Sequence, residues 1–588
     1  MKNLIAIFLI LLGSSTLYAQ VGIGTTDPKG ALDIVTTNDT GIVIPRVSSI
    51  NSVTDGDGNP PVEGTMVFDI SKNRLCIFAA GDWICLGLDD NGNPAAINTS
   101  VNEYELEDQS YFKASNTSVN DYFGMSVAIS GDGLTMAIGA PHEGSTATTI
   151  NGDQTNTSSN RGAVYVFHNN GIQWQQQAYI KPSTLYFSFG HSVSLDLNGN
   201  TLAVGRDNEV FIFRRISGIW TEQQQITYPQ LPFWGRFGGQ VDLSNDGNTI
   251  AISAYANTSL ATGVGADQTH STGFVRNFGG TYIYSFNGID WVEEEFFKAN
   301  VTDEDFFGFK IALSGDASVL AVSAPFEDSD ASGVNGDENN NLAENSGAVY
   351  VYKKLAGVWQ FDAYLKASNA DPNDRFGSSL AISGDGHSIV IGAPNEACGF
   401  PGINASAGSN NFKPGSGAAY VFNDNTGSWL EEAYIKNSIL DNFDLLGYSS
   451  VAINENGNVI AIGSYGEDSL RRGILNEPST NNDLANAGAV LIFQKLQGNW
   501  IQTKMLKASN PLFNNNLSFA ENNLGTLIPG SGVVFVQLTS NNISMSTLGD
   551  TIIVGSLYED SNATGIQGDQ DNTAAPNSGA VYLYKKID

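Results

Sequence analysis

The chain has 588 residues, with 28 Lys and Arg against 61 Asp and Glu, which gives a formal net charge of −33 at pH 7. Only 15% of the residues are charged and 41% are apolar, so the acidity reflects a shortage of basic residues in a chain that can bury a core. A surface this acidic repels nucleic acid and anionic lipid and attracts cations, so we expect no nucleic acid partner.

Residues 1–19 have the pattern of an export signal. Lys2 precedes the apolar run LIAIFLILL, and small residues follow as far as Gln20. This run is too short for a stable membrane span, and no later segment has the length of a membrane helix. We therefore expect an exported protein that is secreted or held at the cell surface, with the periplasm as the alternative, and a mature chain with no transmembrane segment.

Residues 20–88 contain short β-rich runs separated by Gly, Pro, Asn and Asp, which predict a small all-β module. The runs are VGIGTTDPKGALDI, GIVIPRVSSI and GTMVFDISKNRLCIFAAGDWICLG. In the order VGIGT, IPR and GDW the module resembles the N-terminal module of many exported proteins of Bacteroidetes-type bacteria. Similar segments occur near fibre-like proteins, so the resemblance implies an oligomer, a trimer, formed through this module. Residues 89–109 have the composition of a linker.

Two of the three cysteines lie in the stretch LCIFAAGDWIC of this module. A turn at Ala80-Gly81 places Cys76 opposite Cys85 on one face of a hairpin, where directly opposed side chains reach one another. Export permits oxidation. Two interpretations are open, a Cys76–Cys85 disulfide or two buried thiols, and a count of free thiols on the unfolded, unreduced protein distinguishes them. Cys398 has no evident partner.

Residues 110–588 repeat one pattern with a period of roughly 70 residues. Clear copies begin at Phe123-Gly124, Phe307-Gly308 and Phe376-Gly377, weaker ones begin at Phe189, Phe237 and Leu446, and a damaged copy ends at Tyr584. Each copy holds four strand-like runs, which are SVAIS, TMAIGA, GAVYVF and WQQQAYIK in the first. Trp opens the fourth run in six copies, which we interpret as core packing between neighbouring units.

Seven repeats of four strands, without helical periodicity, predict an all-β, seven-bladed β-propeller. The chain ends just after the third strand of the last repeat, so that blade lacks its fourth strand. The missing strand is found at the start, because YFKASN at 111–116 matches YLKASN at 364–369. We therefore predict that the N-terminal strand closes the last blade and leaves no open edge.

Phe-Gly before the first strand and Gly-Ala-Pro after the second, as at 139–141 and 392–394, form the signature of the FG-GAP repeat. The chain resembles bacterial FG-GAP proteins and, more distantly, the headpiece propeller of integrin α subunits. The resemblance implies an extracellular propeller used for binding or adhesion. The integrin calcium loops between the first and second strands are not matched, since the loops here read SGDG, LNGN or NENG and carry one carboxylate or none.

Other acidic residues recur in the loop between the second and third strands, and we expect them to converge on one face of the propeller. Two interpretations are open: each carboxylate caps local backbone N–H groups, or the loops bind Ca²⁺. Asp121, Asp305, Asp374 and Asp444, before the Phe-Gly position, belong to the same face. The candidate Ca²⁺ ligands are Glu143, Asp153, Glu327, Asp337, Glu396, Glu467, Glu559 and Asp569.

No catalytic motif is evident, because the five histidines fit no Ser-His-Asp arrangement and no nucleophile elbow or phosphate-binding loop is present. We expect a binding protein without enzyme activity, whose loop face holds a protein or a glycan. Two alternatives stay open. One is a polysaccharide-active or other hydrolytic enzyme with its site at the mouth of the central channel, and the other is a structural component of a surface appendage.

Overall fold

The computed structural model describes residues 106–157, 160–184, 187–228, 235–269, 277–301, 303–404, 410–476, 482–510 and 541–586, and short pieces before residue 106. The chain divides into two compact units, Met1–Glu103 and Tyr104–Asp588. No helix long and apolar enough to cross a membrane occurs among the described residues.

The N-terminal unit contains two small sheets. β1 (Val21–Ile23) pairs in parallel with β2 (Leu32–Ile34). The second sheet has the order β3 (Arg46–Val47), β4 (Met66–Asp69), β5 (Arg74–Ala79), β6 (Asp82–Leu88) and β7 (Pro94–Asn98). The expected linker 89–109 thus holds β7, which pairs with β6, and the start of the strand that follows.

The hairpin β5–β6 has the expected register. Cys76 lies opposite Cys85, and Phe78 lies opposite Trp83. The side chains of these two cysteines lie outside the described part of the structure, so the disulfide stays a prediction.

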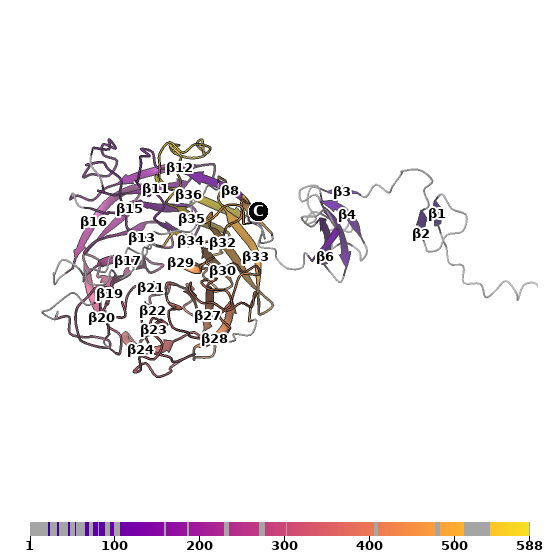
Figure 1. Ribbon diagram of the computed structural model, residues 1–588. Helices are drawn as coiled ribbons and strands as arrows, with labels where there is room; N and C mark the ends of the chain where they lie inside the picture. The colour runs from indigo at the N-terminus through magenta and orange to yellow at the C-terminus, as the bar shows by residue number, and fades with distance from the viewer. Residues whose placement is uncertain are drawn as a thin grey trace, which may run out of the picture. The chain divides into compact units, whose positions relative to one another are not determined.

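The second unit is a propeller of seven antiparallel blades, as predicted, with the first strand of each blade nearest the centre (Figure 1). Six blades are four-stranded sheets, and the seventh sheet, that of blade 6, has an added edge strand. Blades 1 to 3 are β9 (Ser126–Ile129), β10 (Thr135–Ala140), β11 (Ala163–Asn169), β12 (Trp174–Ile180); β13 (Ser192–Leu195), β14 (Thr201–Arg206), β15 (Glu209–Ile216), β16 (Ile219–Thr227); and β17 (Phe237–Leu243), β18 (Thr249–Ala254), β19 (Thr281–Phe286), β20 (Trp291–Phe297).

Blades 4 and 5 are β21 (Ile311–Leu313), β22 (Val319–Ala324), β23 (Ala348–Leu355), β24 (Val358–Leu365); and β25 (Ser379–Ile382), β26 (Ser388–Ala393), β27 (Ala418–Asn423), β28 (Leu430–Ile435). Blade 6 is β29 (Leu446–Ile453), β30 (Val459–Ser464), β32 (Ala489–Leu496) and β33 (Asn499–Lys507), with a short edge strand, β31 (Gly473–Leu475). Blade 7 is β34 (Ile543–Met545), β35 (Thr551–Ser556), β36 (Ala580–Lys586) and β8 (Leu106–Phe112).

Blade 7 closes the propeller as predicted. β8, from the start of the unit, pairs antiparallel with β36 from its end, with Phe112 opposite Val581 and Tyr111 opposite Tyr582. Phe112 also packs against Phe167 and Trp174 of blade 1, with ring centroids 5.4 and 5.7 Å apart. The closing strand therefore joins the last sheet by its backbone and the first sheet by its side chains.

Apolar side chains fill the spaces between blades. Seven clusters of buried residues each combine two adjacent blades. The Trp of the fourth strand takes part in six of these spaces, as expected, and its indole can bond across the interface: Trp359 Nε1 donates to Glu294 Oε1 of the preceding blade at 3.0 Å. The Trp residues are Trp174, Trp220, Trp291, Trp359, Trp429 and Trp500.

The Phe-Gly and Gly-Ala-Pro motifs meet between blades. The Phe-Gly glycine has a positive φ, which is 95° at Gly377, in a region that favours glycine. A Cβ atom at Gly392 would lie only 2.2 Å from the carbonyl oxygen of Gly447 in the next blade. The two glycines thus allow the backbone of one blade to touch that of its neighbour, and Ser379 Oγ bonds the same carbonyl at 2.7 Å.

The turns between first and second strands meet around the axis at the opposite end of the blades. Each turn donates one backbone N–H to a carbonyl of the turn in the next blade, over 2.8 to 3.1 Å, and the seventh bond returns to the first blade. The side chains of Asn245 and Glu455 also bond across this end, at 3.2 Å. The donors are Gly131, Leu197, Asn245, Gly315, Asp385, Glu455 and Thr547.

Candidate functional site on the loop face

We call the face formed by the second-to-third-strand loops and by the segments that join successive blades the loop face. The five predicted glutamates begin the second-to-third-strand loops of five blades, and every one is buried. Each makes an ion pair with a buried Lys at the end of the fourth strand of the same blade or directly after it. The pairs are Glu143–Lys181 and Glu327–Lys366 at 2.7 Å, Glu559–Lys113 at 2.6 Å, Glu396–Lys436 at 2.5 Å, and Glu467–Lys507.

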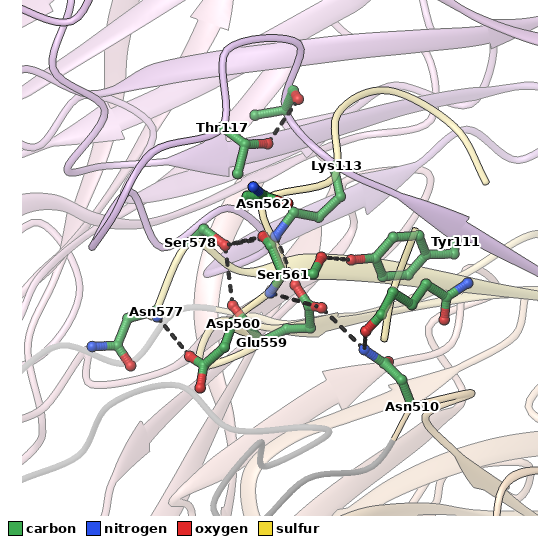
Figure 2. Close-up of polar contacts among 12 residues, drawn as sticks. Tyr111, Lys113, Thr117, Asn510, Glu559, Asp560, Ser561, Asn562, Asn577 and Ser578 are labelled. Carbon is green, nitrogen blue, oxygen red and sulfur yellow. Dashed lines mark hydrogen bonds and ion pairs between the residues drawn. The ribbon is translucent and has the colours of Figure 1, made fainter. Parts of the chain in front are cut away.

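The second carboxylate oxygen of each Glu serves its own loop. It accepts the backbone N–H of the residue two positions later, at 2.9 to 3.2 Å in all five blades. Figure 2 shows this arrangement in blade 7, where Lys113 Nζ reaches both Glu559 and Ser578. The capping interpretation is therefore seen in the contacts, with a buried ion pair added to it.

The segment Lys-Ala-Ser-Asn after the fourth strand connects neighbouring blades. Lys366 bonds the Glu of its own blade, whereas Asn369 Nδ2 donates to Glu396 Oε1 of the next blade at 3.1 Å. In the same way, Asn116 Nδ2 donates to Glu143 Oε1 at 2.8 Å, and Asn510 Nδ2 donates to Glu559 Oε1 at 3.0 Å. The buried glutamates thus tie the loops of adjacent blades together.

Blade 3 keeps the Lys but has Asn257 in the place of the Glu. Lys298 Nζ donates to the carbonyl of Gly279, and Asn257 Oδ1 accepts the N–H of Ser259 at 2.8 Å. Burial lowers the pKa of Lys298 to about 7. Blade 2 has only a short turn at Asp207-Asn208 between β14 and β15, so the long loop is missing there.

The predicted Gly-Asp aspartates lie on the exposed outer part of the same loops. Asp153 Oδ1 accepts the N–H of Thr155 at 3.0 Å, and these hydrogen bonds lower the pKa of Asp153. Asp337 and Asp569 accept the N–H of Asn339 and Asp571 in the same way, both at 3.0 Å. Each of these carboxylates caps its own turn and lies apart from the buried Glu–Lys pairs.

The aspartates before the Phe-Gly position are buried on the loop face. Asp374 Oδ2 accepts the N–H of Asp371 at 3.0 Å. Burial, with the nearby charge of Glu396, raises the pKa of Asp374 to about 7. Burial likewise raises the pKa of Asp121 and Asp444 to about 7, and that of Asp305 to about 8.

These donor sets do not fit a calcium ion. Ca²⁺ takes six to eight oxygen ligands, whereas one oxygen of each Glu already accepts an ammonium and the other accepts N–H groups. Across the described residues, no three side chains of His, Cys, Asp or Glu come together as metal ligands would. Sequence reasoning missed the lysines, although Lys113, Lys181, Lys298, Lys366, Lys436 and Lys507 recur at one position after the fourth strand.

Comparisons with known proteins agree with this architecture. The family model of the FG-GAP repeat matches residues 107–167 and 359–422, and the phage tail like trimerisation region matches residues 22–100. A comparison with curated proteins gives no match. The chain thus carries FG-GAP repeats in its propeller and, before it, a region similar to trimerisation regions of phage tail type.

Two solved propellers are similar to the chain at low identity. The β-propeller domain of Cps50 (Swd1) from Myceliophteria thermophila has a TM-score of 0.44 and 8% identity, over 82% of this chain and 100% of that chain. The WD40 repeats of RRP9 have a TM-score of 0.42 and 10% identity, over 82% of this chain and 99% of that chain. The fold is established here by the strand pairing itself.

Proposed function

We propose that this protein is an exported binding protein that presents the loop face of its propeller to an extracellular protein or glycan. The observation that supports this most is the construction of the loop face. Buried Lys–Glu pairs fix the base of the loops in five blades, while polar residues such as Asp153 and Asp337 stay exposed at their outer parts. Rigid scaffolds with exposed loops are typical of recognition surfaces.

The loop face also exposes apolar side chains that a partner can cover. Phe412 is 81% exposed and Phe443 is 64% exposed, in blade 5 and in the segment that leads to blade 6. Aromatic residues are enriched where proteins recognise partners. Screening the purified protein against arrayed glycans and extracellular proteins tests this proposal, with Phe412→Ala expected to weaken binding without lowering the melting temperature.

The match of residues 22–100 to a trimerisation region supports a trimeric form. A trimer that carries three propellers binds a surface of repeated partners with higher avidity than one propeller, because the second and third binding events are intramolecular. Light scattering of the full chain should give a mass about three times that of the monomer, and the unit that begins at residue 104 should be monomeric.

The same match favours a second candidate, a structural component of a surface appendage. In that case the trimer assembles further, and the propeller binds neither arrayed glycans nor proteins. Turnover of a polysaccharide on the same screen would contradict both proposals and support the hydrolytic alternative.

A further inference from the structure

A cluster of cationic, aromatic and polar side chains surrounds the propeller axis on the loop face. Its members stand at the loop-face ends of the first and second strands in blades 2 to 5, next to the Phe-Gly and Gly-Ala-Pro positions. We call it the axial cluster, and it consists of His191, Arg236, Tyr255, Phe309, Phe326 and Arg375.

Ring contacts join the members of the cluster in blades 3 to 5. The guanidinium of Arg375 lies over the ring of Phe326, 5.2 Å from its centroid, and the ring centroids of Phe326 and Phe309 are 6.3 Å apart. The ring centroids of Phe309 and Tyr255 are 6.1 Å apart. The positive charge of Arg236 acts on both Tyr255 and His191, which lowers the pKa of each relative to burial alone.

Three polar atoms of the cluster have no hydrogen-bond partner among the residues that the structure describes. They are Nε2 of His191, the hydroxyl of Tyr255 and Nε of Arg375. His191 and Tyr255 are each only 2% exposed. Buried polar atoms are nearly always satisfied, so each of these three unpaired atoms indicates a position that a ligand or water completes.

Hydrogen bonds between blades cross the far end of the axis. Lys310, next to Phe309, donates from Nζ to Asn541 Oδ1 at 3.1 Å and so joins blades 4 and 7. Beyond it, the seven turns bond to one another in a closed circle, with Asn245 and Glu455 bridging its interior. A ligand therefore reaches the axial cluster from the loop face.

The chemistry of the cluster selects an anion that also has apolar and hydroxyl groups. Arginine has donors only and matches a carboxylate with two N–H groups. Arg236 is held by Asp207 at 2.7 Å, whereas Arg375 makes no ion pair within the described part of the chain. The aromatic rings of the cluster make its surroundings apolar, and the tyrosine hydroxyl and the imidazole can each bond a hydroxyl group. On a protein of net charge −33, such a site is the place where an anion is least repelled.

We propose that the axial cluster binds an acidic sugar. Arg375 receives the carboxylate, and Tyr255 and His191 bond the hydroxyl groups. This inference rests on the proposed binding role and names the class of glycan that the loop face recognises.

Calorimetric titration of the full chain with galacturonic and glucuronic acids and their methyl esters tests the proposal, because the ester keeps the ring and its hydroxyl groups but loses the charge of the carboxylate. We expect at least one acid to bind at least tenfold more tightly than its ester. Arg375→Gln should weaken that binding at least tenfold, and Tyr255→Phe at least threefold. Tyr255→Phe removes only an unpaired hydroxyl, so its melting temperature should stay that of the parent.

Arg161→Gln is the matched control, since Arg161 lies over Phe187 at 4.8 Å in a second-to-third-strand loop outside the cluster. Its affinity should equal that of the parent. Absence of binding by both acids, equal binding of acid and ester, tighter binding of inorganic sulfate, or full affinity in Arg375→Gln would each overturn the acidic-sugar site. Retention of a partner on the protein and glycan screen in that case would leave the proposed function standing.

Discussion

At the scale of single residues, the loop face contains buried lysines. Five of them pair with a buried Glu of the same blade, whereas Lys298 of blade 3 bonds a backbone carbonyl. A buried ion pair adds little over an apolar pair, but removal of one partner is costly because the other charge remains buried. In the described part of the chain, the five Glu–Lys pairs and Lys298, which bonds a backbone carbonyl instead of a carboxylate, therefore give an internal comparison within one molecule.

We predict that Lys366→Met lowers the free energy of unfolding by about 3–5 kcal/mol, because the carboxylate of Glu327 stays buried without its ammonium. Lys298→Met at the equivalent position of blade 3 should be neutral or should raise the melting temperature at pH 6. Thermal and urea unfolding of the two variants measure the difference, and equal losses would contradict the role of the ion pair.

Asn257→Glu should restore the missing pair in blade 3. The new carboxylate replaces Asn257 beside Lys298, which favours the charged ammonium and raises a pKa that now stands at about 7. We expect a higher melting temperature at pH 7 than in the parent. Asn257→Gln adds the same length without charge and should not give this gain.

The buried aspartates predict a pH dependence of definite sign. Burial raises the pKa of Asp374 from 3.8 to about 7, so between these values the folded state holds a proton that the unfolded state has released. Stability therefore falls as pH rises from about 4 to about 7, by about 1.4 kcal/mol per pH unit for one such group. Asp121, Asp305 and Asp444 act in the same direction.

Asp374→Asn should reduce this slope, since Asn keeps an acceptor for the N–H of Asp371 and does not titrate. The measurement is the melting temperature between pH 4 and pH 8. Asp153→Asn, on an exposed carboxylate, is the control and should leave the slope as it is. Above about pH 7, Lys298 and Lys310 act in the opposite sense, because burial lowers the pKa of each to about 7.

At the scale of strands and turns, glycine decides how closely blades approach. Gly392→Ala should destabilise the propeller because the new Cβ would overlap the carbonyl oxygen of Gly447 at 2.2 Å, and backbone cannot yield as a flexible side chain does. Gly427→Ala has a φ of 80° and nothing within 4 Å, so it should cost only about 1 kcal/mol for its backbone conformation. A smaller loss for Gly392→Ala would contradict the close approach.

The sequence predicted the strands well because their alternation of apolar runs and turn residues is local. It also predicted the closure of the propeller, since YFKASN has the sequence of a fourth strand but stands before the first repeat. It did not predict the Glu–Lys pairs, because four of them join residues 38 to 40 positions apart and the fifth, Lys113–Glu559, joins residues 446 positions apart, all through the register of strands within a blade. The axial cluster was missed for a related reason, because its members stand at variable positions that differ in chemistry from blade to blade.

At the scale of the whole molecule, lysines neutralise the buried glutamates of the loop face in five blades, so no metal ion has to balance these charges. We therefore predict that EDTA leaves the melting temperature and the loop proteolysis pattern unchanged. The measurement compares thermal unfolding with EDTA and with added Ca²⁺. A higher melting temperature with Ca²⁺ would contradict this prediction and support Ca²⁺ binding by Glu143, Asp153 and the equivalent acidic residues of the other blades.

The closing strand has a mechanical consequence. If the N-terminal unit is anchored while the propeller binds a partner, force on the chain reaches the propeller through β8, the first strand of the second unit. The force then acts first on the pairing of β8 with β36. The backbone hydrogen bonds between these strands, the packing of Phe112 against Phe167 and the Lys113–Glu559 ion pair resist it together. Separation of β8 from β36 would remove the fourth strand of blade 7 and open the propeller. The force that the propeller withstands is therefore set by the same residues that complete its last blade.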